Sequence, residues 1–275
     1  MTQVLKNPVE LLKELGVRSP EDLDIEAVAE YCGATIRYRP LLGCEARVMG
    51  YKDRAIITVN ANSKRPRQRF SAGHELGHWM RDRGTVAFKC DDQNFVRDWS
   101  LDNPEYRANR FASDLLLPLF LFCPLAYGMP ITFASVRKLA DAFQMSLTAT
   151  AIRLVSHGSY PSMLVCLGPQ GREWFVASPT VKGKLWPVEN AGFHTGALRL
   201  LTQGGTDSDG PKEVRADEWI NHPYADQYWI KEDSLIVRPE LVLALLWWED
   251  EQQLIDFAEW EERNSDKRSD PRSDR

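Results

Sequence analysis

The segment H-E-L-G-H at residues 74–78 constrains this chain more than any other feature. Residues four apart lie on one face of an α-helix, so His74 and His78 on a helix can reach a single metal ion. Glu75 follows the first histidine and is placed to take a proton from water at that ion. Zinc is the usual metal for such a nitrogen and oxygen site. The alternative is a solvated helix face that carries two histidines and an acid.

The residues around this motif favour a helix that packs against other elements. Apolar residues recur at helical spacing, at Phe70, Leu76, Trp79 and Met80. Gly73 and Gly77 each weaken a helix by about 1 kcal/mol relative to alanine. A bare surface helix has no need of them, so we expect another backbone to approach closely at these two positions.

A third protein ligand is required, and Glu105 is the first choice. Asn103 is a good N-cap and Pro104 a good first helical residue, which predicts a helix start. Glu105 then lies in the first turn, where the helix dipole favours an ionised carboxylate. Ala108 and Ala112 follow on the same face and allow a close approach to the histidine helix. The alternatives are a first-turn acid without a metal role, or a loop ligand among Asp91, Asp92, Asp98 and Asp102.

Three motifs together resemble the ImmA/IrrE group of zinc metallopeptidases. They are R-x-R-F-x-x-x-H-E-L-G-H at 67–78, E-x-x-A-N-x-F-A at 105–112 and L-L-L-P at 115–118, and the resemblance covers roughly residues 5–158. It implies a Zn²⁺ site with His74, His78 and Glu105 as ligands and Glu75 as general base. Characterised members of that group cleave transcriptional repressors of stress or mobile-element genes, which implies a protein substrate of this kind.

Composition favours a soluble, cytoplasmic protein large enough for two domains. The 275 residues are 43% hydrophobic and 27% charged, and the N-terminus lacks the apolar stretch of a signal peptide. The apolar run 115–127 is short and interrupted by Pro118 and Pro124, so we expect it inside the protein and not in a membrane. The five scattered cysteines are expected to be free thiols, with Cys90 either a loop residue or a metal ligand.

The net charge of −5 argues against broad electrostatic binding to nucleic acid. One local exception is the basic run K-R-P-R-Q-R at residues 64–69, just before the predicted metal helix. It is interpreted either as a solvated start of that helix or as a dock for an acidic stretch of a protein substrate.

The N-terminal part is expected to be an α+β, zincin-like peptidase domain over residues 1–160. Two helices are predicted in 7–32, with a helix start at Ser19–Asp22, and short alternating strands at 34–38, 46–51 and 55–59 predict a small antiparallel sheet. A helix–turn–helix outline at 131–158, with Ser146 as cap of its second helix, is expected to complete the core. A DNA-reading role is less favoured, because the second helix carries only Arg153 as a basic residue.

Residues 161–260 are expected to form a β-rich accessory domain for sensing or substrate recognition. A hairpin is predicted at 163–167 and 173–177, and an exposed loop at 203–211. The segments 229–237 and 241–248 are two further strands or a strand followed by a helix. The tail 261–275 is charged and is expected to be disordered.

The resulting hypothesis is a zinc-dependent endopeptidase that acts on a regulatory protein, a repressor or an antitoxin-like protein. Glu75 takes a proton from water and passes it to the leaving amine. The alternative is a DNA-binding or protein-binding regulator that keeps the zincin fold without turnover, which an intact Glu75 disfavours.

Overall fold

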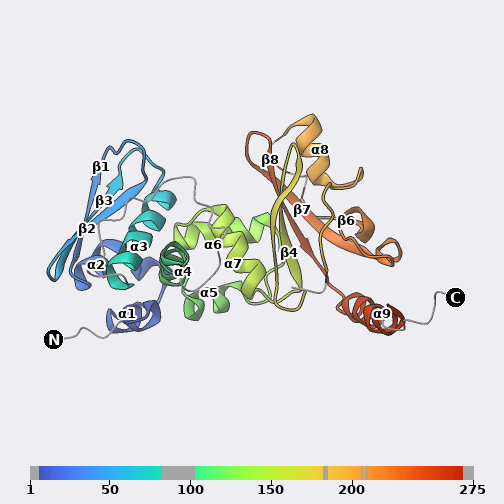
Figure 1. Ribbon diagram of the computed structural model, residues 1–275, viewed down its shortest axis with the longest axis horizontal. Coiled ribbons are helices and arrows are strands. Elements are labelled where there is room, and N and C mark those ends of the chain that lie inside the picture. Colours follow the sequence, from blue (N-terminus) through green and yellow to red (C-terminus); the bar gives the residue numbers. More distant parts are fainter. Residues whose placement is uncertain (1–5, 82–102, 182–184, 206, 208–209, 269–275) are drawn as a thin grey trace. The chain divides into compact units, whose positions relative to one another are not determined.

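The computed structural model describes residues 6–81, 103–181, 185–205, 207 and 210–268 (Figure 1). Its helices are α1 (Pro8–Glu14), α2 (Ile25–Tyr31), α3 (Arg65–Arg81), α4 (Pro104–Leu116), α5 (Leu119–Ala126), α6 (Phe133–Phe143), α7 (Leu147–His157), α8 (Gly196–Gln203) and α9 (Gln252–Arg268). Its strands are β1 (Ala34–Arg39), β2 (Ala46–Tyr51), β3 (Arg54–Asn60), β4 (Ser162–Gly168), β5 (Gly171–Ala177), β6 (Lys212–Arg215), β7 (Trp229–Arg238) and β8 (Leu241–Trp247). Short 3-10 turns lie at Pro20–Asp22, Ala216–Glu218 and Ala225–Gln227. The protein is therefore of the α+β class, as expected.

The chain divides into two compact units whose boundary differs from the one expected at residue 160. Unit 1 comprises Met1–Leu125 and Lys138–Thr150, and unit 2 comprises Ala126–Arg137 and Ala151–Arg275. The helical pair is thus shared, because the first turns of α6 and the second half of α7 belong with the C-terminal sheet. One reason is a hydrogen bond of 2.7 Å from the backbone N–H of Phe133 to Oδ2 of Asp233 on β7.

The sheet of unit 1 has the strand order β1-β3-β2 and is mixed, not antiparallel as predicted. Strand β1 pairs with β3 in parallel, whereas β2 and β3 form an antiparallel hairpin. All three strands were placed correctly by their alternation. Because a strand with one buried face alternates in the same way in either direction, that pattern does not report strand direction.

Helices α2 and α3 pack against one face of this sheet (Figure 1). Helix α2 begins at Ile25, and the side chain of Asp24 caps it by accepting the backbone N–H groups of Glu26 and Ala27. The predicted start at Ser19 is instead the start of the 3-10 turn. The reason is local: the carboxylate of Asp22 accepts the N–H of Ser19 at 2.9 Å and closes the chain into a tight turn.

The helical pair follows the predicted outline. Oγ of Ser146 accepts the N–H of Ala149 at 3.2 Å, so Ser146 caps α7 as expected. Between Leu147 and Ser156 every residue of α7 is at least partly buried. A helix that reads DNA exposes its contacting side chains, so this burial favours a packing role for α7.

Unit 2 is built on a five-stranded antiparallel sheet in the order β5-β4-β8-β7-β6. The predicted hairpin is β4 and β5, and the ambiguous segments are the strands β7 and β8, joined at Glu240 with a positive φ of 61°. Every residue of β4 is buried, which means that both faces of the sheet are covered. One face packs on a core that includes Trp219, Trp248 and Phe257.

Adjacent carboxylates on β7 bind the starts of two helices on opposite faces of the sheet. Asp233 binds the start of α6, as above, and Glu232 accepts the N–H of Ala197 in α8 at 2.9 Å. Successive side chains of a strand point to opposite faces, so neighbouring positions serve both layers. This arrangement joins residues 126–137 to the C-terminal sheet.

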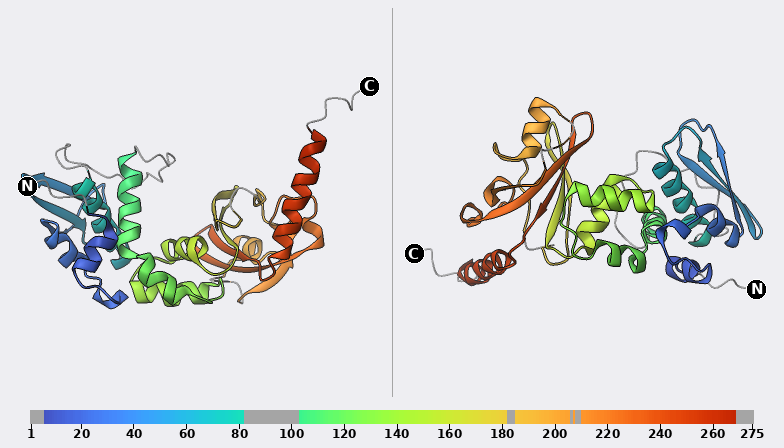
Figure 2. Two further views of the ribbon diagram at one scale, coloured as in Figure 1. Left: turned by 90° about the horizontal axis from the view of Figure 1, so that it is seen from below. Right: turned by 180° about the vertical axis from the view of Figure 1, so that it is seen from behind.

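The C-terminal segment contains a helix where disorder was expected. Helix α9 continues to Arg268, so residues 261–268 are helical, and residues 269–275 lie outside the described part (Figures 1 and 2). Phe257 is buried and Leu254 packs against the same core. Anchoring of its first turns lets the helix propagate into the charged stretch.

The apolar run 115–127 is interrupted at Pro118 as predicted, since α4 ends at Leu116 and α5 begins at Leu119. The second predicted interruption is wrong, because Pro124 lies inside α5. Among the described residues, no single helix combines the length and the apolar character needed to cross a membrane. Helices α4 and α5 satisfy both criteria only when taken together, as a pair bent by 58°.

Candidate metal centre

Helix α3 carries both motif histidines and is buried on all sides from Ser71 to Met80. The rings of His74 and His78 lie one turn apart in an edge-on arrangement, with centroids 4.7 Å from each other. Their Nε2 atoms face one another at 3.1 Å. A helix thus forms where the H-E-x-x-H spacing predicts it, and it brings the two imidazoles to one point.

Helix α4 brings Glu105 to the same point. Its start is the predicted one, because Oδ1 of Asn103 accepts the N–H of Glu105 at 2.9 Å and Pro104 is the first helical residue. Oε2 of Glu105 lies 3.1 Å from Nε2 of His74, and Oε1 lies 3.3 Å from Nε2 of His78. The cap therefore fixes the backbone of the residue whose carboxylate meets both rings.

These separations fit a small metal ion. A tetrahedral ion with bonds of about 2.0–2.1 Å holds its ligand atoms about 3.3 Å apart. The three observed separations, 3.1, 3.1 and 3.3 Å, are close to that edge length. Among the described residues, one cluster of potential ligand side chains is arranged so that it could hold a metal ion. It consists of His74, His78 and Glu105.

The close approach of α3 and α4 rests on glycine and alanine. A Cβ added at Gly77 would lie 3.0 Å from Cα of Ala108, and one at Gly73 would lie 3.4 Å from Cβ of Ala112. Ala108 and Ala112 are almost fully buried. The two glycines thus have the packing role that the sequence predicts, and the contact sets the distance between the histidines and Glu105.

Asn109 contacts the candidate site, which the sequence analysis did not predict. Its Oδ1 lies 2.9 Å from Nδ1 of His74 and accepts the ring hydrogen there. With the hydrogen on Nδ1, the Nε2 atom directs its lone pair toward His78 and Glu105, as metal binding requires. The available signal was spacing, since Asn109 is one helical turn after Glu105 on the same face.

The charge of the centre is set by its own members. Hydrogen bonds from His74 and then from His78 hold the pKa of Glu105 well below its usual range, against the opposing effect of burial. Glu105 is therefore an anion at neutral pH. The carboxylate oxygens of Glu105 and the two imidazole nitrogens converge on one point, so a cation or protons must lie between them. A divalent metal ion is such a cation.

Of the other residues predicted to take part in the site, only Glu75 lies in the described part of the chain. Glu75 follows His74 on α3, and its side chain is fully buried. The loop alternatives for the third ligand, Asp91, Asp92, Asp98 and Asp102, lie outside the described residues, as does Cys90.

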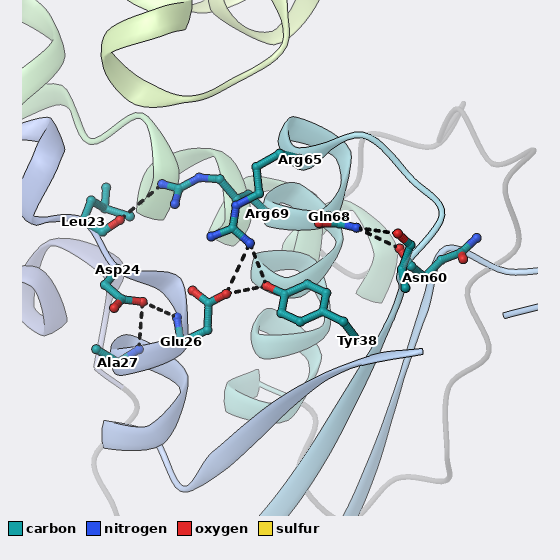
Figure 3. Close-up of polar contacts among 10 residues, drawn as sticks. Leu23, Asp24, Glu26, Ala27, Tyr38, Asn60, Arg65, Gln68 and Arg69 are labelled. Atoms are coloured by element: carbon teal, nitrogen blue, oxygen red, sulfur yellow. Dashed lines mark hydrogen bonds and ion pairs between the residues drawn. The ribbon is translucent and has the colours of Figure 1, made fainter. Parts of the chain in front are cut away.

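The basic run 64–69 has a structural role that neither interpretation anticipated (Figure 3). Arg65 donates to the hydroxyl of Tyr38 on β1 at 3.1 Å and contacts the carboxylate of Glu26 on α2 at 3.3 Å. Arg69 is only 3% exposed and donates to the backbone carbonyl of Leu23 at 3.3 Å. These contacts fix the start of α3, and so the helix that carries the histidines, against α2 and the sheet.

Comparisons with known proteins agree with this geometry. Residues 29–155 match the sequence model of the family Peptidase_M78, described as the IrrE N-terminal-like domain. Among solved structures, a Mycobacterium tuberculosis transcriptional regulator is similar with a TM-score of 0.54 and 14% identity, over 87% of this chain and 73% of that chain. At this identity the likeness shows the fold alone. A search of curated proteins finds no match. The matched residues include both histidines, Glu105 and Asn109, so residues 29–155 are a domain of the IrrE N-terminal-like type.

Proposed function

We propose that this protein is a zinc-dependent endopeptidase that acts on a regulatory protein. The observation that carries the proposal is the convergence of His74, His78 and Glu105 with separations that match the edge of a zinc tetrahedron. The peptidase family of residues 29–155 supports hydrolysis of a peptide bond as the reaction.

The residues of the site divide the work of such a hydrolysis. Nε2 of His74, Nε2 of His78 and a carboxylate oxygen of Glu105 would hold the zinc, which supplies a Lewis acid for the peptide carbonyl and for water. Asn109 keeps the His74 ring in its orientation. Three protein ligands would leave a zinc ion one position for water or substrate, as in catalytic zinc sites.

Glu75 serves as the proton carrier in this proposal. It accepts a proton from the attacking water while the water oxygen bonds to the carbonyl carbon, and it gives that proton to the amine nitrogen as the C–N bond breaks. Its position next to His74 on a buried helix holds it beside the metal ligands.

A transcriptional repressor is the proposed substrate class. This rests on the resemblance of the motifs at 67–78, 105–112 and 115–118 to those of proteases that cleave such repressors. The test combines the zinc-loaded protein with the repressor encoded by a neighbouring gene, followed by mass spectrometry of the fragments.

Glu75→Gln is the matched control, because it keeps the size and the helix but does not accept the proton. We expect this variant to bind zinc like the parent and to produce no fragments. Equal fragment yields from parent and variant would contradict the proposed mechanism. Zinc binding without any cleavage by the parent protein, across a panel of repressors, would favour the non-catalytic regulator instead.

A further inference from the structure

The sheet of unit 1 has a second face that α2 and α3 do not cover (Figure 1). On the covered face the inward side chains are buried, among them Val48, Ile57 and Val59. The alternate residues point the other way, and we name them the outer face. It consists of Thr35, Arg37 and Arg39 on β1, Arg54, Ile56, Thr58 and Asn60 on β3, and Arg47, Met49 and Tyr51 on β2.

The outer face concentrates positive charge. It holds four arginines and no acidic residue, although the whole chain has a net charge of −5. All four arginines are exposed, and within the described part of the chain none forms an ion pair with a carboxylate. The carboxylate of Glu45, just before β2, accepts a hydrogen bond from Ser63 at 2.5 Å and forms an ion pair with Arg67 at 3.8 Å.

Strand pairing arranges these arginines in an ordered pattern. Arg37 and Arg47 flank Thr58 in one row across the three strands. Neighbouring strands lie about 4.8 Å apart, so the Cα atoms of this pair are about 10 Å apart. Arg39 lies two residues along β1 from Arg37, which is about 7 Å. Guanidinium groups spaced in this way match a ligand with repeated negative charges, and not a single small anion.

Exposed apolar side chains lie among the arginines. Tyr51 is 76% exposed and Met49 is 61% exposed, and Ile56 pairs with Met49 in the next row. Tyr51 also carries the ammonium group of Lys52 over its ring at 5.4 Å. A sheet face that combines an exposed aromatic ring with arginines offers a stacking surface as well as charge.

We propose that the outer face binds a single strand of nucleic acid. Its phosphates would pair with Arg37, Arg39 and Arg47, and its unpaired bases would stack on Tyr51 and on guanidinium planes. A duplex hides its bases and leaves the apolar side chains without a partner. An acidic peptide in extended form pairs with a sheet edge through backbone groups, which a sheet face does not offer. The inference is independent of the metal centre, because none of these residues belongs to it.

The net negative charge of the chain, which argued against broad binding to nucleic acid, is compatible with this local site. Net charge averages the whole chain, whereas the arginines become neighbours only once three separate strands pair in the observed register. The sequence shows R-x-R at 37–39 and isolated arginines at 47 and 54, which form no basic cluster by themselves.

The test measures binding of the full chain to a labelled oligothymidylate of about 12 nucleotides by fluorescence anisotropy, a length within the usual range for one site. With three or four phosphates neutralised, we expect log K to fall with log salt at a slope of about −2 to −3. The double variant Arg37→Gln/Arg47→Gln should reduce that slope by about 1.4 and weaken binding about tenfold or more at about 50 mM salt. Tyr51→Leu, which keeps an apolar side chain, should weaken binding about tenfold.

Lys13→Gln/Arg110→Gln is the matched control, since it removes two charges from α1 and α4, away from the outer face. It should leave the affinity within about twofold of the parent. The proposal is overturned if the parent does not bind at about 50 mM salt, or if both double variants lose affinity alike. It is also overturned if a duplex binds as tightly as the single strand, or if polyglutamate displaces the oligonucleotide at equal charge concentration. All substituted residues of the outer face are exposed, and circular dichroism verifies that each variant is folded.

Discussion

Gly77→Ala tests whether the contact between α3 and α4 sets the geometry of the metal centre. The new Cβ would lie 3.0 Å from Cα and 3.2 Å from the carbonyl oxygen of Ala108, and 3.2 Å from Cβ of Phe111. Ordinary contacts between carbon atoms are about 3.5–4.0 Å. Two of these atoms are backbone, so relief requires the two helices to separate by a few tenths of an ångström.

The magnitude follows from two opposing effects. Overpacking of a buried contact destabilises a protein by about 1–3 kcal/mol, whereas replacing a helical glycine by alanine stabilises it by about 1 kcal/mol. The net loss of unfolding free energy is therefore about 0–2 kcal/mol. Glu105 lies three residues before Ala108 on α4 and moves with it. Metal–ligand distances tolerate about 0.2 Å, so we expect zinc affinity to fall at least tenfold.

Competition with a chromogenic chelator measures the zinc affinity, and urea unfolding measures stability. Gly73→Ala is the matched control one turn earlier, where the added Cβ meets the flexible end of Leu116 at 3.3 Å and Cβ of Ala112 at 3.4 Å. It should keep zinc affinity within about threefold and leave stability unchanged or raised by up to about 1 kcal/mol. The reasoning is refuted if Gly77→Ala binds zinc like the parent, or if Gly73→Ala loses as much affinity.

Three further outcomes follow. Asn109→Leu should lower zinc affinity about 10- to 100-fold without unfolding the protein, because it frees the ring of His74, and an unchanged affinity by chelator competition would remove Asn109 from the site. Asp233→Ala should destabilise the protein by about 1–3 kcal/mol in urea, since it leaves the buried N–H of Phe133 without its acceptor, and a loss below about 0.5 kcal/mol would contradict that role. A protein truncated to residues 1–160 should still bind one zinc. It should unfold at lower urea concentration and bind more of an apolar dye, because residues 126–137 lose their contacts with β7. A truncated protein that is folded and binds no zinc would place a ligand in the C-terminal half.

Local patterns predict most of the metal centre. Three features of the centre could be predicted because each depends on residues close together in sequence. They are the histidines at i and i+4, the helix start at Asn103-Pro104, and the two glycines of α3 that allow close packing. Asn109 was missed because a single polar residue in a helix has many ordinary uses. Only the approach of His74 on another helix distinguishes it.

Longer-range features were harder to predict. Strand β1 runs parallel to β3, yet its alternation is the same as that of an antiparallel edge strand. Strand β8 is apolar on both faces, so its sequence has no period that separates strand from helix. Residues 126–137 belong to unit 2, where Phe133 donates a hydrogen bond to Asp233, 100 residues away in sequence. In each case the deciding partner is distant in sequence.

The central claim is that His74, His78 and Glu105 form one zinc site. Anomalous diffraction at the zinc absorption edge, from crystals of the full chain grown with zinc, locates the ion directly. We predict one strong peak at about 2.0–2.2 Å from Nε2 of His74, Nε2 of His78 and an oxygen of Glu105. A peak at the two histidines with an aspartate of residues 82–102 in place of Glu105, or no peak at the histidines, would contradict the account.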